Sequence, residues 1–102
     1  MKKILLCCSM GMSTSIVVSA MKKAAAAQGK DYEISATDIN SVDEEDETPD
    51  VVLVGPQVAH ALDQVKELLE GTDAKVAVMN KEDYGSVNGE AILKFAEELA
   101  EA

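Results

Sequence analysis

Hydrophobic positions along the chain follow two periods that alternate, and this alternation predicts strands and helices in turn. Residues 4–7 and 51–54 are continuous apolar runs, which are typical of strands buried on both faces of a sheet. Residues 76–79 form another apolar run of strand length. Residues 32–37 alternate apolar and polar side chains, which predicts a half-exposed edge strand.

Helical periodicity fills the segments between these strands. The first helix is expected from about Ser13 to Gln28, with Gly29 at its C-terminal cap. A second helix is expected to follow the Gly55-Pro56 turn and to end near Gly71. The side chains expected to face the core are Ile16, Val17, Ala20, Met21 and Ala24 in the first helix, Val58, Ala61, Leu62, Val65, Leu68 and Leu69 in the second, and Ala91, Ile92, Phe95, Ala96 and Leu99 in a last helix.

The connection at residues 38–50 is rich in acidic side chains. We interpret it as a solvated crossover between strands, and a docking segment for a partner is the alternative. Ser41 and Glu44 have the spacing of a capping box, which predicts a short helix within this connection.

Strand–helix alternation predicts an α/β fold with a four-stranded parallel sheet, order 2-1-3-4, covered by helices on both faces. The first and third strands should be central, and the second should lie at an edge. In this order the chain reverses direction between strands one and three, and ligands bind in the crevice outside the carboxyl ends of the strands at such a point. The loop after Cys8, the Gly55-Pro56-Gln57 turn and the segment at residues 80–84 should meet there.

Composition limits the classes of function. A chain of 102 residues is expected to form one domain over residues 1–102. The net charge of −10 argues against nucleic acid and against anionic membrane surfaces as partners. No apolar run approaches the ~20 residues that a transmembrane helix needs. Two adjacent cysteines do not make a disulfide framework, and a reducing cytoplasm is the expected setting.

Candidate chemistry lies between the first strand and the first helix. The segment contains a cysteine followed by small, polar and flexible residues, namely Cys8, Ser9, Met10, Gly11, Met12, Ser13, Thr14 and Ser15. A strand–loop–helix of this kind binds anions, because the first turn of the helix has unpaired N–H donors and a positive dipole end. The same field favours a thiolate at the loop entrance. A reactive cysteine that binds or carries a phosphate-like anion is expected, with no metal and no cofactor.

Five residues separate Cys8 from Thr14, which resembles the Cys-x5-Arg loop of low-molecular-weight protein tyrosine phosphatases. Here Thr14 stands at the arginine position, and the chain contains no arginine. A bidentate guanidinium clamp on the transferring oxygens is therefore absent, which favours a phosphate carrier over a phosphatase. Spacing alone does not separate Cys8 from Cys7, because five residues also separate Cys7 from Ser13.

The residues from Cys8 to Ser15 resemble the active-site loop of phosphotransferase-system (PTS) IIB components of the lactose/cellobiose (chitobiose) class. The segments at residues 50–59 and 84–89 resemble the same family in order. The resemblance implies that Cys8 accepts a phosphoryl group from a phosphohistidine of the IIA component. It further implies transfer to a sugar, such as cellobiose, chitobiose or lactose, bound by the membrane component IIC. Cys7 then matches a core position at the strand end.

Other candidate residues are weighed against ordinary structural roles. The resemblance makes residues 9–15 the phosphate-binding loop, and places Gly55, Pro56, Gln57, Asp83 and Tyr84 in neighbouring loops. Met10 and Met12 are equally well explained as packing residues or as partner contacts. His60 is expected to have a surface or core role rather than to relay phosphate. Asp83 loosely resembles the acid of the related phosphatases, but a loop or cap role is favoured.

Three alternatives remain from the sequence. They are a cysteine-dependent phosphatase or arsenate reductase, a thiol redox domain using the adjacent cysteines, and a purely structural binding domain. The chain is expected to be a monomer when alone, and to be transiently at the membrane through IIC.

Overall fold

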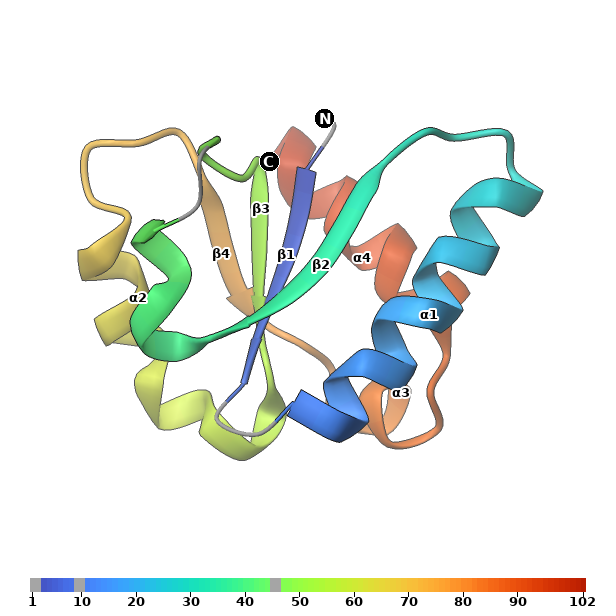
Figure 1. Cartoon of the computed structure of the whole chain (residues 1–102), viewed down its shortest axis with the longest axis horizontal. Helices are drawn as coiled ribbons and strands as arrows, with labels where there is room; N and C mark the ends of the chain where they lie inside the picture. The colour runs from blue at the N-terminus through green and yellow to red at the C-terminus, as the bar shows by residue number, and fades with distance from the viewer. Residues whose placement is uncertain (1–2, 9–10, 45–46) are drawn as a thin grey trace.

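The computed structural model describes residues 3–8, 11–44 and 47–102, with only the backbone described at residues 11–13. Four parallel strands form one sheet in the order β2-β1-β3-β4 (Figure 1). Their bounds are Lys3–Cys8 for β1, Glu33–Asp38 for β2, Val51–Val54 for β3 and Lys75–Val78 for β4. The predicted order, with the first and third strands central and the second at an edge, is confirmed.

Helices cover both faces of this sheet (Figure 1). One face carries α1 (Gly11–Ala27) and α4 (Gly89–Glu101), with the short helix α3 (Lys81–Gly85) beside them. The other face carries the 3₁₀ helices η1 (Ile39–Glu44) and η2 (Pro56–Ala61), and η2 continues into α2 (Leu62–Leu68). The predicted α/β architecture is therefore confirmed.

The alternation of side chains along β1 divides the core in two. Ile4 and Leu6 face α1 and α4, while Leu5 and Cys7 face η1, η2 and α2. The neighbouring central strand β3 follows the same alternation, because Ile4 pairs with Val51 and the parallel register continues from there. Both central strands are buried along their whole length, as continuous apolar runs predict.

The start and the buried face of the first helix differ from expectation. α1 begins at Gly11, two residues before the expected Ser13. Ile16, expected in the core, is 58% exposed, whereas Thr14 and Val18 are buried. The buried face follows the i, i+3, i+4 rule from Thr14, and Ile16 lies on the opposite side of that stripe. The prediction took Ile16, the larger apolar residue, as the first residue of the buried face. The structure corrects this, because the buried face begins at Thr14.

The predicted capping box is also wrong. The short helix of the acidic connection begins at Ile39, where the Asp38 carboxylate accepts a hydrogen bond from the Asn40 N–H at 3.1 Å. Ser41 and Glu44 both lie within the helix rather than at its start. Sequence patterns also missed α3, because a helix of five residues is too short to show a period.

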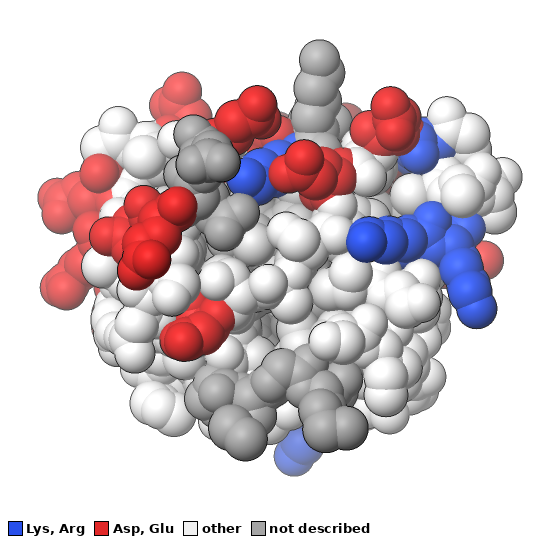
Figure 2. All heavy atoms as spheres, viewed as in Figure 1, with Lys and Arg blue, Asp and Glu red and all other residues white. Residues whose placement is uncertain are grey.

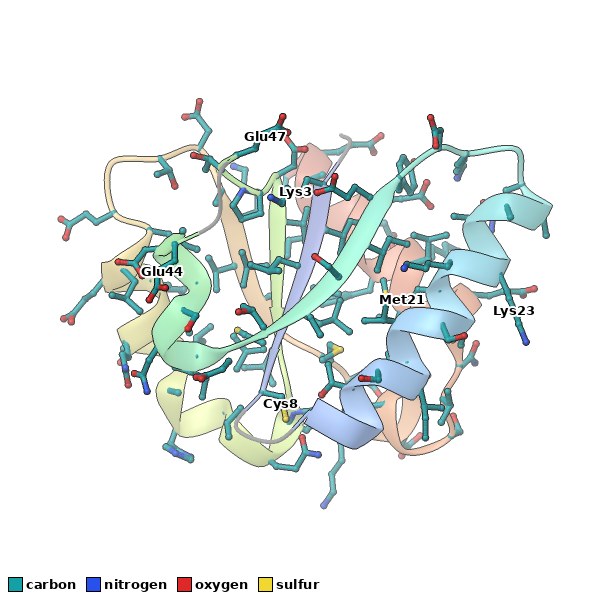
Figure 3. All side chains as sticks on the ribbon, viewed as in Figure 1. Lys3, Cys8, Met21, Lys23, Glu44 and Glu47 are labelled. Atoms are coloured by element: carbon teal, nitrogen blue, oxygen red, sulfur yellow. The ribbon has the colours of Figure 1, made fainter. Side chains whose placement is uncertain are left out.

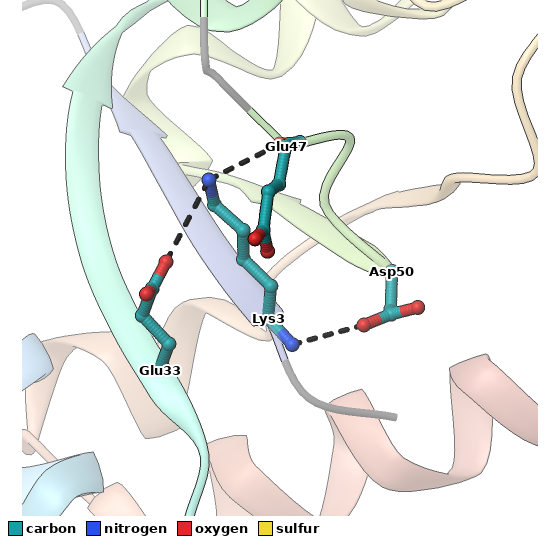
Figure 4. Close-up of polar contacts among 4 residues, drawn as sticks. All are labelled: Lys3, Glu33, Glu47 and Asp50. Atoms are coloured by element: carbon teal, nitrogen blue, oxygen red, sulfur yellow. Dashed lines mark hydrogen bonds and ion pairs between the residues drawn. The ribbon is translucent and has the colours of Figure 1, made fainter.

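A clasp at the amino ends of the strands lies at the far end of β1 from Cys8. The Lys3 N–H donates to Asp50 Oδ2 at 2.9 Å, and Lys3 Nζ donates to the Glu47 carbonyl at 3.1 Å (Figure 4). Lys3 Nζ also forms an ion pair with Glu33 Oε2 at 3.6 Å. These contacts join the starts of β1, β2 and β3, so the clasp stabilises the sheet without approaching the cysteines.

Candidate active site

Cys8 is the last residue of a central strand and lies at the carboxyl edge of the sheet. Figure 3 shows its sulfur beside the beginning of α1. Only 6% of the residue is exposed. The chain leaves β1 towards β2 on one side and enters β4 from β3 on the other, so Cys8 lies at the reversal point of the strand order. This is the position where parallel sheets bind ligands.

The turn after β3 lies directly against the thiol. The Gly55 N–H donates to the Cys7 carbonyl at 2.9 Å, which holds the turn next to the end of β1. A β-carbon on Gly55 would lie 3.7 Å from Cys8 Sγ and 2.9 Å from Gln57 Oε1. The predicted Gly55-Pro56-Gln57 turn and Cys8 are thus brought together, and the glycine leaves space beside the sulfur.

Cys7 differs sharply from Cys8 in environment. Its side chain is fully buried on the η1/α2 face of the sheet. Burial, and secondarily the nearby charge of Cys8, raises the pKa of the Cys7 thiol to about 12. A thiol with this pKa is almost entirely protonated at neutral pH and is a poor nucleophile. Neither cysteine is in a disulfide.

Thr14, the residue at the arginine position of the phosphatase loop, points into the protein. It lies in the first turn of α1, is fully buried, and its Oγ1 lies 3.1 Å from Tyr84 Oη of α3. The hydroxyl is thus used in a bond between two helices. The neighbouring backbone N–H groups at the start of α1 have no acceptor within the helix, which is a general property of helix N-termini.

The remaining predicted residues are spread around this edge. Ser9 and Met10 lie outside the described residues, as do the side chains of Gly11, Met12 and Ser13. Ser15 is exposed near the start of α1, and Pro56 begins η2. His60 is exposed in η2, and Asp83 lies in the first turn of α3.

Asn80 was not predicted as a site residue, but it organises this edge. Its Oδ1 accepts hydrogen bonds from the N–H groups of Glu82 at 2.9 Å and Asp83 at 3.1 Å, and so caps α3. Asp83, for which a loop or cap role was favoured, lies within α3, and Asn80 is the cap. An asparagine shortly after a strand, with acids two and three residues later, is the sequence signal for such a cap.

Charge is distributed unevenly over the surface. Figure 2 shows acidic side chains gathered towards the top and left of the molecule, whereas β1 and β3 end at the bottom in the same view. On the face shown, these acidic side chains therefore lie away from the end of the sheet at which Cys8 lies, in a chain of net charge −10. Among the described residues, no cluster of His, Cys, Asp or Glu has the arrangement of a metal site. None of their helices is long and apolar enough to cross a membrane.

This site can form a covalent intermediate on sulfur. It combines a thiol at the carboxyl edge, a helix N-terminus next to it, and a glycine that leaves space beside the sulfur. A helix N-terminus favours a negative charge such as a thiolate or a phosphoryl group.

Comparison with known proteins places the chain in a family. The family "PTS system, Lactose/Cellobiose specific IIB subunit" matches residues 3–95. The chain is 43% identical to the PTS galactose-specific EIIB component of Lactococcus lactis subsp. cremoris over 96% of its length and 95% of the relative. It has the same identity, over the same shares of both chains, to the PTS cellobiose-specific EIIB component of Lactococcus lactis subsp. lactis.

A solved structure agrees with this match. The cellobiose-specific phosphotransferase IIB component of Borrelia burgdorferi superimposes with a TM-score of 0.79 at 31% identity. The alignment covers 98% of this chain and 92% of that protein. The chain therefore belongs to the lactose/cellobiose-specific IIB family of the phosphotransferase system, whose members act as sugar phosphotransferases.

Proposed function

We propose that Cys8 carries the phosphoryl group, receiving it from a phosphohistidine of a IIA protein and passing it to a sugar bound by the membrane component IIC. The observation that carries this assignment is the contrast between the two thiols. Cys8 ends a strand beside a helix N-terminus and beside Gly55, while Cys7 is fully buried with a raised pKa. Only Cys8 combines a nucleophilic atom with a setting that stabilises an anion.

The transfer is a pair of in-line displacements at phosphorus. The Cys8 thiolate attacks the phosphorus, the S–P bond forms, and the P–N bond of the phosphohistidine breaks with its electron pair returning to the imidazole. Backbone N–H groups of residues 9–15 receive the three equatorial oxygens. A sugar hydroxyl then attacks the phosphorus, loses its proton, and releases the Cys8 thiolate. Positioning and electrostatic stabilisation carry both steps, and neither requires a metal.

One surface around Cys8 serves both partners. Both exchanges must reach the same sulfur, so IIA and IIC are expected to compete for the carboxyl edge of the sheet. Ile16 and Val87, which are 58% and 36% exposed, are apolar side chains that we propose as further partner contacts. Met10 and Met12 are further proposed contacts, because flexible thioether side chains adapt to different partners. The chain acts as a cytoplasmic monomer that meets the membrane only through IIC.

The relatives support a class of sugar rather than one sugar. The galactose-specific and cellobiose-specific components from Lactococcus lactis are equally similar to this chain, at 43% identity. We propose a β-linked disaccharide of the cellobiose, chitobiose or lactose type. The sugar itself is bound by IIC.

The phosphatase alternative lacks its main catalytic cation. The chain has no arginine, and Thr14 at that position is buried against Tyr84. Loss of a transition-state donor typically costs roughly 100- to 1000-fold in rate. The same loss benefits a carrier, because water then removes the phosphoryl group more slowly than the sugar does. Negligible hydrolysis of an aryl phosphate is expected, and brisk hydrolysis would favour the phosphatase.

The full transfer chain tests this function. Phosphorylated IIA, this protein and membrane vesicles containing the matching IIC should form sugar phosphate only when all three are present. Cys7→Ser should support sugar phosphate formation, and Cys8→Ser should abolish it. Sugar phosphate formed at the normal rate with Cys8→Ser would overturn the assignment.

A further inference from the structure

The hydroxyl pair of Thr14 and Tyr84 joins the beginning of α1 to a segment seventy positions along the chain. Both residues are buried, and the two oxygens lie 3.1 Å apart. No buried side-chain polar atom lacks a hydrogen-bond partner in the part of the chain that the structure describes. Breaking this bond therefore leaves a buried hydroxyl without its partner, which costs more than losing an exposed bond.

A second contact fixes α1 further along its length. A β-carbon on Gly89, at the start of α4, would lie 2.5 Å from the backbone C and O atoms of Ala20 and 2.8 Å from the Met21 nitrogen. Only glycine allows this approach of the two helices. Thr14 and Ala20 are six residues apart in α1, which corresponds to about 9 Å along the helix axis. Two contacts at this separation fix the direction of the axis as well as its position.

The corner between α3 and α4 holds these two contacts in a fixed relation. The Val87 N–H donates to the Tyr84 carbonyl at 3.2 Å, and the Asn88 N–H donates to the Asp83 carbonyl at 2.9 Å. Asn88 Oδ1 then caps α4 by accepting from the Ala91 N–H at 3.1 Å. Val87 has a φ of 54°, which is costly for a β-branched residue. Such a conformation persists only where the surrounding contacts determine it.

From these contacts we infer that Tyr84 is a positioning residue for phosphoryl transfer, which it serves by holding the first turn of α1 through Thr14. The N–H groups of that turn face the same edge as Cys8, so their direction sets how well they receive the phosphoryl oxygens. Small misplacements of such donors are expensive, because a displacement of about 1 Å can cost roughly 100-fold in rate. This inference rests on the proposed function and adds a contact outside the phosphate loop to it.

The test removes one hydroxyl at a time. Tyr84→Phe keeps the ring and its packing, and Thr14→Val keeps the side-chain shape, but both lose the bond. Each is expected to slow transfer from phosphorylated IIA to Cys8 by roughly tenfold or more, with the KM for IIA unchanged. Thr14→Ser keeps the hydroxyl, and its transfer rate should be close to that of the unmodified protein. The double variant Tyr84→Phe/Thr14→Val should be no slower than either single variant, because both remove the same bond.

A matched control separates positioning from general stability. Tyr32 Oη donates to Glu97 Oε2 at 2.7 Å at the other end of the sheet. Tyr32→Phe therefore removes a tyrosine hydroxyl from a part-buried bond far from Cys8, and should leave the transfer rate unchanged. The phosphorus NMR resonance of phosphorylated Cys8 should move in Tyr84→Phe and stay in place in Tyr32→Phe.

The outcomes distinguish this inference from the proposed function. If the unmodified protein is labelled on Cys8 but Tyr84→Phe matches it in rate and in phosphorus resonance, the inference is wrong and the proposed function stands. If Tyr84→Phe and Tyr32→Phe slow transfer equally, the effect is one of stability and the inference is again wrong. If the unmodified protein never takes the label, the proposed function fails and the inference fails with it.

Discussion

Gly55 and Cys8 are placed so that the glycine's missing side chain leaves space next to the thiol. A β-carbon on Gly55 would lie 3.7 Å from Cys8 Sγ, which is an ordinary van der Waals contact. The Gly55 backbone is extended, with φ −62° and ψ 142°, so its conformation does not require glycine. We therefore expect the absence of a side chain at Gly55 to matter for the surroundings of the sulfur rather than for the turn.

We expect Gly55→Ala to fold but to transfer phosphate more slowly. The new methyl group would lie 2.9 Å from Gln57 Oε1, and this exposed, flexible side chain can move away. The methyl group then occupies space that the phosphoryl group or the attacking donor needs. Transfer from phosphorylated IIA should slow by roughly tenfold or more, while the melting temperature changes little. An unchanged transfer rate would show that this space is not used.

Cys7 should make stability depend on pH on the alkaline side. Burial raises its pKa from 9.0 to about 12, so the folded state keeps a proton that the unfolded state loses above pH 9. The stabilisation is fully present below pH 9 and is lost as the pH rises towards 12. Cys7→Ala should therefore show a flatter fall of unfolding free energy over this range in urea titrations. Equal slopes for both proteins would contradict the burial of a protonated thiol.

The raised pKa of Cys7 also predicts that alkylation of this thiol is slow in the folded protein. At pH 8 only about one Cys7 thiol in ten thousand is ionised in the folded protein, given its raised pKa. In Cys8→Ser, iodoacetamide should leave Cys7 unmodified at pH 8 until urea unfolds the chain. Rapid modification of folded Cys8→Ser at that pH would place Cys7 in a different environment.

Alanine substitutions at Gly89 and at Gly85 should have different effects on the stability of the protein. Gly89→Ala places a methyl group 2.5 Å from the Ala20 backbone, so the helices must separate, at a cost of about 3 kcal/mol. Gly85→Ala meets no atom within 4 Å and lies in α3, where alanine is the better helix former. It should be neutral or stabilising by up to about 1 kcal/mol. Urea denaturation of the two variants tests this contrast, and equal destabilisation would contradict the close approach at Gly89.

Val87 offers a stabilising substitution. Its φ of 54° lies in the left-handed region, which asparagine adopts more readily than valine. The residue is 36% exposed, so it lies at the surface of the protein rather than in its core. Val87→Asn should raise the free energy of unfolding by about 1 kcal/mol. A clear loss of stability would mean that the valine side chain contributes more through packing than its backbone strain costs.

Sequence patterns predicted the strand order because central and edge strands of the sheet have different patterns of apolar residues. The continuous runs at β1 and β3 indicated central strands, and the alternating β2 indicated an edge. The same patterns placed Cys8 and Gly55 at one edge, and in the structure a β-carbon on Gly55 would lie 3.7 Å from Cys8 Sγ. Two signals of different origin, strand burial and loop chemistry, agreed there.

The remaining features depend on tertiary contacts that leave weak local signals. Thr14 is a polar residue on the buried face of α1, and its partner Tyr84 comes from a distant helix, so periodicity favoured Ile16 instead. Spacing also could not choose between Cys7 and Cys8. The family resemblance favoured Cys8, and the fold adds that the Cys7 side chain faces the core. The close approach at Gly89 depends on where two helices cross, which no local pattern records.

The most direct test of the account is fragment mass spectrometry of the protein after incubation with phosphorylated IIA. The spectrum should show one phosphoryl group on Cys8, none on Cys7, and none anywhere in Cys8→Ser. The phosphorylated form should also persist in buffer for longer than the transfer step takes, because the site lacks the cation of a phosphatase. A phosphoryl group on Cys7, or one retained by Cys8→Ser, would contradict the assignment of Cys8 as the carrier.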